Sequence, residues 1–361
     1  MKKVLAVLLV CVLALAAVSC GKSENSDGVQ GGKYESDKLK VFLPGAYIAE
    51  NIVPDFEKKF GVEVIVENFD SNEMMYTKLA AGDTYDVLIP SDYMIERLIK
   101  EDYIQPIDKS KVPNMANLSD QVKGLGFDPE LKYSVPYFWG NVGIVYNKNV
   151  VSEDDLKNEG FDIFRDTKYK GKLYMYDSER DAFMIAFKQL GYSCNTENDD
   201  EINAAYDWLV DISKNMSPVY VTDECIDGMA NGSKDLCLMY SGDAAYVLSE
   251  NEEMGYYVPE CGTNIWCDAM VIPKSSNNTS LAYEFINYIL SDDVCRDNTA
   301  EVGYTTPNKN IFDEVTAPDG DVDGNDAYIP RTGYAKDETF NDNEYLRQRL
   351  TELLIKVKAA K

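Results

Sequence analysis

The order of apolar and polar positions after residue 38 predicts short strands that alternate with amphipathic helices. Short apolar runs between turn residues are typical of strands, and apolar positions three and four residues apart are typical of helices. Strands that alternate with helices predict βα units, and therefore an α/β fold with parallel strands. The strands are expected at 39–43, 62–67, 85–90, 173–176, 236–240 and 266–273, and the helices at 49–60, 72–81, 92–100, 180–190, 200–213, 243–250, 280–290, 292–301 and 344–358.

Single residues sharpen several of these boundaries. Gly61 and Gly82 follow predicted helices, and glycine readily takes the left-handed conformation that ends a helix. Ser91 precedes the helix 92–100 and is expected to cap it. Residues 312–342 are rich in Asp, Gly and Pro, which predicts a loop along the surface.

The N-terminal segment reads as an export signal. Lys2 and Lys3 precede an apolar run over 4–18, which is shorter than the ~20 residues that span a bilayer. Small residues before Cys20 are typical of bacterial lipoprotein signals, so we expect a signal peptide over 1–20 and a lipid on Cys20. The alternative is ordinary cleavage after Ala16.

A polar, Gly- and Ser-rich stretch follows this signal. Residues 21–37 offer little apolar surface for burial and are expected to form a flexible tether. The length of the remaining body, 38–361, favours two domains over one. Together these segments predict a folded body held at the outer face of the cell membrane, or released into the periplasm.

Composition excludes several functions. The chain carries a net charge of −27, so nucleic acid and anionic lipid headgroups would repel it, which argues against binding to either. The chain contains no histidine, which excludes a Ser-His-Asp triad and histidine-based metal sites. No cysteines form a C-x-x-C pair, so a zinc site is not expected. No other metal and no cofactor are expected either. Six cysteines in the body could be paired or could be buried thiols, and both alternatives stay open: Cys194, Cys225, Cys237, Cys261, Cys267 and Cys295.

Several segments, in order, resemble the polyamine-binding proteins of ABC uptake systems, which are the spermidine/putrescine receptors. The likeness runs from about residue 39 to about residue 312, and each motif alone is weak. The segments that carry it are 72–79 (NEMMYTKL), 85–93 (YDVLIPSDY), 107–110, 133–137, 139–140, 266–268 (WCD) and 303–308 (GYTTPN).

This resemblance implies a two-lobed fold of the periplasmic-binding-protein type (type II), with an α/β sheet in each lobe and the ligand between the lobes. Lobe 1 is expected over 38–143 plus 271–310, and lobe 2 over 144–270 plus 311–361. The implied partners are ABC permease subunits with a cytoplasmic ATPase, and the implied state is a monomer. The implied ligand-binding residues are Tyr47, Ser91, Tyr93, Asp181, Tyr240, Trp266, Asp268 and Tyr304.

These residue types suit an aliphatic polycation. Aromatic rings cover methylenes and face ammonium groups, and carboxylates supply the counter-charge. Asp268 is expected to bind an ammonium group, with Trp266 as a wall. The family commonly has acids where this chain has Ala46 and Ser178, and it commonly has a Trp near the first strand. Fewer acids favour a ligand with fewer charges, so putrescine is expected to bind at least as well as spermidine.

Three other functions remain as alternatives. A related receptor for a non-polyamine organic solute would share the fold and the export signal. A surface hydrolase with two catalytic carboxylates, such as a glycosidase, could use the many acids, although no local motif points to one. An adhesin or structural surface protein is disfavoured because the sequence has no internal repeat.

Overall fold

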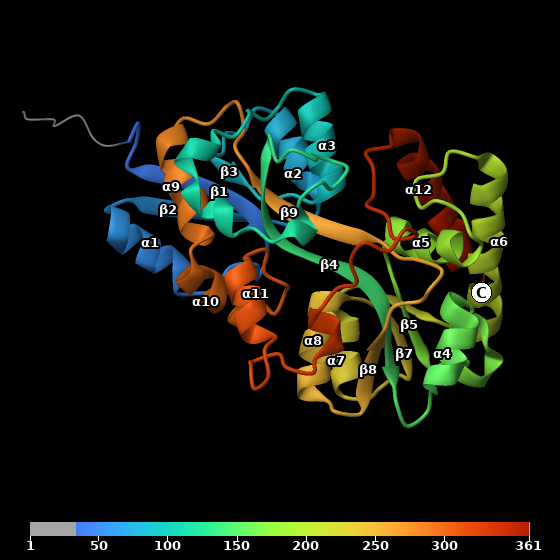
Figure 1. Cartoon of the computed structure of the whole chain (residues 1–361). Helices are drawn as coiled ribbons and strands as arrows, with labels where there is room; N and C mark the ends of the chain where they lie inside the picture. The colour runs from blue at the N-terminus through green and yellow to red at the C-terminus, as the bar shows by residue number, and fades with distance from the viewer. Residues whose placement is uncertain (1–33, 361) are drawn as a thin grey trace, which may run out of the picture. The chain divides into compact units, whose positions relative to one another are not determined.

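The computed structural model describes residues 34–360, and the account below is limited to them (Figure 1). The predicted signal peptide, Cys20 and nearly all of the predicted tether lie outside the described residues. Among residues 34–360, no helix is both long enough and apolar enough to cross a membrane.

The first half of the sheet is built from βα units. Strand β1 lies between β2 and β3, and both pairs are parallel. Val41, Phe42 and Leu43 of β1 are fully buried, as expected for a parallel strand covered on both faces. The elements are β1 (Lys38–Pro44), α1 (Ile52–Phe60), β2 (Glu63–Phe69), α2 (Asn72–Ala80), β3 (Val87–Leu88) and α3 (Asp92–Lys100).

Two long strands continue from the first half of the sheet into the second. Residues 134–141 of β4 (Ser134–Asn147) pair with β9 (Ile265–Val271), and residues 142–147 pair with β7 and β8. The strand order is β2-β1-β3-β9-β4-β7-β5-β6, with β8 also on β4. Figure 1 shows β4 and β9 running side by side between the two halves. The expected lobe boundaries, at 143/144 and 270/271, fall within these strands and stay a prediction.

The second half contains the parallel pairs β5–β6 and β5–β7. Its elements are α4 (Glu153–Glu159), β5 (Leu173–Tyr176), α5 (Glu179–Gln189), α6 (Asp199–Met216), β6 (Val219–Val221), α7 (Glu224–Ala230), β7 (Leu236–Tyr240), α8 (Ser241–Glu250), β8 (Met254–Tyr257) and α12 (Glu344–Ala359). Helices α9 (Thr279–Ile289), α10 (Asp292–Val302) and α11 (Lys309–Val315) follow β9. Short 3-10 helices are η1 (Lys109–Lys111), η2 (Pro113–Asn117), η3 (Asp120–Val122), η4 (Gly160–Arg165), η5 (Thr167–Tyr169) and η6 (Asp326–Tyr328).

Most predicted elements are present, but several observed ones were not predicted. The sequence pattern missed strands β4, β6 and β8 and helices α4, α7 and α11. Helix α11 takes the first residues of the predicted loop 312–342. Ser91 is the residue before α3, but its side chain does not cap the helix. Its hydroxyl instead accepts a hydrogen bond from Asn72 Nδ2 at 3.0 Å, so the neighbouring amide takes the oxygen that a cap would use.

The six cysteines of the body are free thiols in the described part of the chain, and all but the half-buried Cys261 are buried. Within residues 34–360, no group of acidic or cysteine side chains has the geometry of a metal site.

Candidate ligand-binding site

A row of aromatic rings runs from the first half of the sheet to the second. Tyr47 follows β1, Trp266 belongs to β9, and Tyr176 and Tyr240 end β5 and β7. The ring centroids are 5.5 Å apart from Tyr47 to Tyr304, 5.5 Å from Tyr304 to Trp266, 6.1 Å from Trp266 to Tyr240 and 4.9 Å from Tyr240 to Tyr176. These five rings are called the aromatic row below. Because the carboxyl ends of parallel strands gather at one edge, segments far apart in sequence supply neighbouring rings.

Further contacts fix the first ring of the row. Tyr137 and Phe138 of β4 pack against Tyr47 with centroids 5.6 Å and 5.3 Å away. The Tyr137 hydroxyl donates to the Tyr47 carbonyl oxygen at 2.6 Å and accepts from Asn298 Nδ2 at 2.9 Å. Both the backbone and the ring of Tyr47 are therefore held in place.

Two glycines make room for the larger rings. A Cβ atom at Gly242 would lie 1.2 Å from the ring of Tyr304, and one at Gly140 would lie 2.6 Å from the ring of Trp266. Such distances are far inside van der Waals contact, so both positions require glycine. The row thus depends on backbone that approaches the rings closely.

Asp268 lies at the Tyr47 end of the row. The Tyr47 hydroxyl donates to Asp268 Oδ2 at 2.6 Å, and Ser91 pairs with Asp268 in an antiparallel β-bridge. Burial raises the pKa of Asp268, while hydrogen bonds from the Tyr47 and Ser91 hydroxyls oppose that rise. A cationic group placed here would relieve the cost of keeping this carboxylate away from water.

Asp181 lies at the opposite end, beside Tyr240. Its Oδ2 accepts from the Tyr240 hydroxyl at 2.7 Å and from Ser178 Oγ at 2.6 Å. Its Oδ1 is buried and has no hydrogen-bond partner, and the residue is only 3% exposed. Burial raises the pKa of Asp181, and the neighbouring Arg180 guanidinium partly offsets this effect. One carboxylate oxygen is therefore available to a donor.

Asp243 is an acid of the row that the sequence analysis missed. Its Oδ1 accepts from the Tyr304 hydroxyl at 2.7 Å, and its Oδ2 accepts from the Tyr176 hydroxyl at 3.4 Å. Burial raises the pKa of Asp243 to about 6. The available signal was its position three residues after Tyr240, in the first turn of the helix that follows strand β7.

Asp92 is a second missed acid, at the start of α3. It is 1% exposed, its Oδ1 accepts from the Tyr93 backbone N–H at 2.6 Å, and its Oδ2 is buried without a partner. Burial raises the pKa of Asp92 to about 8. The resemblance implied Ser91 and Tyr93, on either side of Asp92, as site residues.

The structure brings together most of the predicted site residues. Tyr47, Asp268 and Ser91 meet at one end, Tyr304 and Trp266 lie between, and Tyr240 meets Asp181 at the other end. Tyr93 has partners outside the row. Its hydroxyl donates to Glu73 at 3.2 Å and 3.4 Å, and the Arg180 guanidinium lies 3.8 Å over its ring.

Chemically, the arrangement offers contiguous aromatic faces with a carboxyl group at each end. Aromatic faces attract ammonium groups and cover aliphatic carbons, and carboxylates form charge-assisted hydrogen bonds with N–H donors. The described side chains therefore suit an elongated organic cation.

Comparisons with known proteins give a matching sequence family and several relatives. The sequence family described as bacterial extracellular solute-binding protein matches residues 51–322. A spermidine/putrescine-binding periplasmic protein of Salmonella typhimurium is 32% identical over 276 residues, which cover 76% of this chain and 78% of that protein. The putrescine-binding periplasmic protein PotF of Escherichia coli is 29% identical, with 78% and 81% covered.

A solved structure extends the likeness to three dimensions. The spermidine/putrescine ABC transporter substrate-binding protein PotD of Streptococcus pneumoniae superimposes with a TM-score of 0.78 at 33% identity. The match covers 90% of this chain and 99% of that chain. The mixed α/β solute-binding fold expected from the sequence is therefore confirmed.

Proposed function

We propose a function from one premise: the chain belongs to the family of bacterial extracellular solute-binding proteins, and within it to the spermidine/putrescine-binding proteins of ABC transporters. The family binds solutes and does not transform them, in agreement with a binding role. In our proposal the protein captures a polyamine outside the cytoplasm and delivers it to an ABC permease driven by a cytoplasmic ATPase. Its two halves close on the ligand, which stabilises the closed form by binding it more tightly.

The observation that carries this proposal is the aromatic row with Asp268 at one end and Asp181 at the other. Micromolar binding requires about −8 kcal/mol, while one desolvated cation–π contact supplies only ~2 kcal/mol. Several rings and at least two acids must therefore act on the same ligand. In the proposed complex, one ammonium group lies at Asp268, another at Asp181, and the methylenes lie along the rings.

We further propose that putrescine binds at least as well as spermidine. Ala46 and Ser178 stand where the family commonly has acids; Ala46 is exposed, and the Ser178 hydroxyl donates to Asp181. Asp243 adds a carboxyl group, but two tyrosine hydroxyls already donate to it. Each ammonium group brought in without its own carboxylate would be desolvated without compensation, which disfavours the triamine.

Titration of the folded body with a panel of solutes tests both proposals. Putrescine, spermidine, a neutral amide and a sugar are added, with calorimetry and thermal unfolding as readouts. A ligand at a hundred times its dissociation constant should add ~2.7 kcal/mol to the free energy of unfolding. Spermidine binding clearly tighter than putrescine would overturn the preference, and binding of neither amine would favour a receptor for a non-polyamine solute.

The site of attachment is a separate proposal. A lipid on Cys20 would hold the body at the outer face of the cell membrane through the tether. Cys20→Ala should release the protein from the membrane fraction or leave the precursor uncleaved. A wild-type protein that is already fully released would contradict the anchor and favour cleavage after Ala16.

A further inference from the structure

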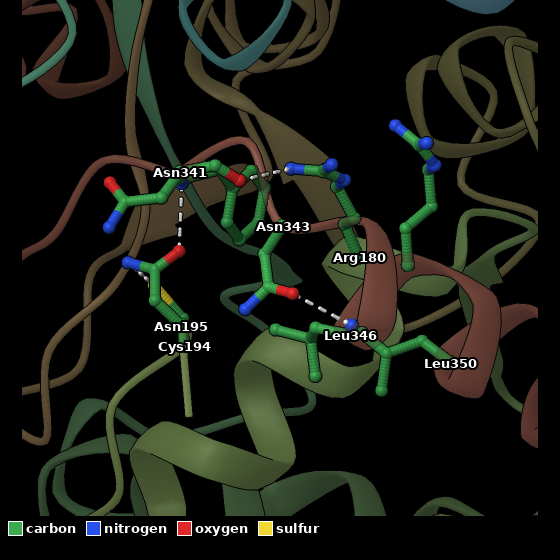
Figure 2. A pocket seen from close by; sticks show the side chains of 9 residues that line it. Arg180, Cys194, Asn195, Asn341, Asn343, Leu346 and Leu350 are labelled. Atoms are coloured by element: carbon green, nitrogen blue, oxygen red, sulfur yellow. Dashed lines mark hydrogen bonds between the residues drawn. The ribbon is translucent and has the colours of Figure 1, made fainter. Parts of the chain in front are cut away.

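Arg180 contacts residues from both halves of the molecule. It belongs to α5 of the second half, and its guanidinium lies 3.8 Å over the ring of Tyr93, in α3 of the first half. The same guanidinium is 5.6 Å from the ring of Phe340, and its Nη1 donates to the carbonyl oxygen of Asn341 at 3.3 Å. Figure 2 shows Arg180 and Asn341 at a pocket that both residues line. One face of Tyr93, which the resemblance implies as a ligand-binding residue, is therefore covered by a cation of the chain.

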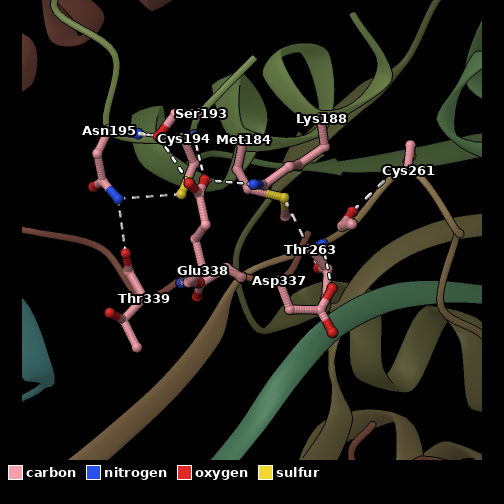
Figure 3. Close-up of polar contacts among 12 residues, drawn as sticks. Met184, Lys188, Ser193, Cys194, Asn195, Cys261, Thr263, Asp337, Glu338 and Thr339 are labelled. Atoms are coloured by element: carbon pink, nitrogen blue, oxygen red, sulfur yellow. Dashed lines mark hydrogen bonds and ion pairs between the residues drawn. The ribbon is translucent and has the colours of Figure 1, made fainter. Parts of the chain in front are cut away.

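The segment that carries Phe340 and Asn341 is anchored on the second half. This segment, residues 330–343, is called the strap. Glu338 of the strap pairs with the buried Lys188 and accepts from Ser193 Oγ at 2.9 Å and from the Cys194 backbone N–H at 2.8 Å (Figure 3). The strap also pairs with the start of β9 through a parallel bridge between Asn264 and Glu338. These contacts fix the strap relative to α5.

The far end of the strap bonds to α3 of the first half. The Asp342 backbone N–H donates to Glu96 Oε2 at 2.6 Å, and Lys100 Nζ donates to the Asp342 carbonyl oxygen at 3.3 Å. Helix α3 is therefore contacted by the second half at two neighbouring places, through Arg180 and through the strap. Neither contact involves the aromatic row.

We propose that Arg180 is a positioning residue that latches the second half to the first and so slows the release of a ligand it does not touch. The inference rests on the proposed function, because it assumes a ligand enclosed between the halves. Separating the halves must uncover the face of Tyr93. It must also either break the hydrogen bond from Arg180 to Asn341 or move the strap away from α3. The latch therefore stabilises the closed form, and apparent affinity follows the population of that form.

The electrostatic surroundings support this role. Burial raises the pKa of Asp92 in the first half and of Asp181 in the second, and Arg180 lies close enough to both carboxyl groups to offset part of that rise. Arg180 therefore interacts with a carboxyl group of each half, and its interaction with Asp92 requires the halves to be together.

The test compares matched arginine variants. Arg180→Met keeps much of the apolar stem and removes the cation, so the dissociation rate of putrescine should rise about tenfold with little change in association rate, as expected for a contact made after encounter. Arg180→Lys keeps the charge and should be intermediate. Arg97→Met is the control, because Arg97 lies 3.6 Å over the ring of Tyr76 within the first half. Stopped-flow tryptophan fluorescence measures both rates.

A double-mutant cycle separates a latch from a general loss of packing. If Arg180 acts through Tyr93, Arg180→Met should cost much less in a Tyr93→Leu background than in the wild type. Additive effects, an unchanged dissociation rate, or an equal effect of Arg97→Met would overturn the latch.

The latch can be tested even if the proposed function is wrong. If wild-type protein binds no amine, the proposed function fails on that result alone. The latch is then judged without ligand, from spin-label distances between α3 and α12 in wild type and Arg180→Met. A longer or broader distance distribution in the variant supports the latch, and an unchanged distribution overturns it.

Discussion

The two carboxyl groups at the ends of the aromatic row have similar first neighbours and different surroundings. Each accepts a short hydrogen bond from a tyrosine hydroxyl, Tyr47 to Asp268 at 2.6 Å and Tyr240 to Asp181 at 2.7 Å. Asp268 lies on β9, which is paired over its length with β4. Asp181 lies in the first turn of α5, beside Arg180 and with a free buried oxygen.

This difference indicates different parts in binding. Asp268 is positioned by a strand shared by both halves, so its place is largely set before a ligand arrives. Asp181 belongs to a helix of the second half, and its charge is partly compensated by an arginine of the chain. We therefore expect the Asp268 end to dominate affinity and the Asp181 end to complete the site on closure.

The largest expected effect is that of Asp268→Asn. Breaking a buried ion pair costs ~3–5 kcal/mol, which corresponds to at least a hundredfold weaker amine binding. The free energy of unfolding without ligand should not fall, since burial raises the pKa of this carboxyl and a neutral Asn avoids the cost of a buried charge. Calorimetry measures the affinity, and Asp120→Asn, on an exposed side chain, is the control. Unchanged affinity would remove Asp268 from the site.

The neighbouring acid Asp92 tests how burial of a carboxyl group affects the stability of the first half. The pKa of Asp92 is about 8 in the folded chain, against an ordinary value near 3.8, so its contribution to stability is present below pH ~4 and is lost as pH rises through 8. Asp92→Asn keeps the acceptor for the Tyr93 N–H and cannot ionise. Without ligand, the free energy of unfolding of the variant should match that of wild type near pH 4 and clearly exceed it near pH 9, by up to ~1.4 kcal/mol for each pKa unit of the shift.

Denaturant unfolding across this range gives the measurement. Parallel stability curves for wild type and Asp92→Asn would contradict a buried, ionisable Asp92.

A smaller loss is expected from Asp181→Asn. The Arg180 guanidinium already offsets part of this carboxyl's charge, so we expect about tenfold weaker putrescine binding, or ~1.4 kcal/mol. Asn keeps an acceptor for the Tyr240 hydroxyl, which limits the structural change. Calorimetry on both single variants decides the comparison. A larger loss at Asp181 than at Asp268 would reverse the proposed order of the two ends.

Much of the fold could be predicted because helices and strands have distinct local patterns. Strand β5 and helix α3, for example, have the bounds that the apolar pattern predicts. Strand β4 gave no such pattern: its residues from Ser134 to Tyr146 are all buried, so polar and apolar positions do not alternate. Helices α4, α7 and α11 are short, and a short helix gives only a weak periodic signal.

The site was less predictable, because its acids are defined by burial and partners that only tertiary packing creates. The Tyr240–Asp181 contact joins residues 59 positions apart, and the Tyr47–Asp268 contact joins residues 221 positions apart. Resemblance to a family identified these four residues. It gave no reason to select Asp92 or Asp243. Its assignment of Tyr93 to the ligand stays a prediction, and the Arg180 guanidinium lies over one face of that ring.

The smallest expected effect comes from restoring an acid near the Asp268 end. Ala46 precedes Tyr47 and is exposed, so Ala46→Glu adds a carboxylate at the edge of the site without filling buried space. An exposed charge acts through water and is screened by salt, so spermidine binding should strengthen about threefold at low salt, with putrescine less affected. Ala46→Gln, with the same shape and no charge, is the control. Titration of both amines at low and high salt measures the change in preference. An equal effect of Ala46→Gln, or an effect that persists in high salt, would show that the added side chain acts by contact and not by charge. The absence of an acid at position 46 would then not explain the preference between diamine and triamine.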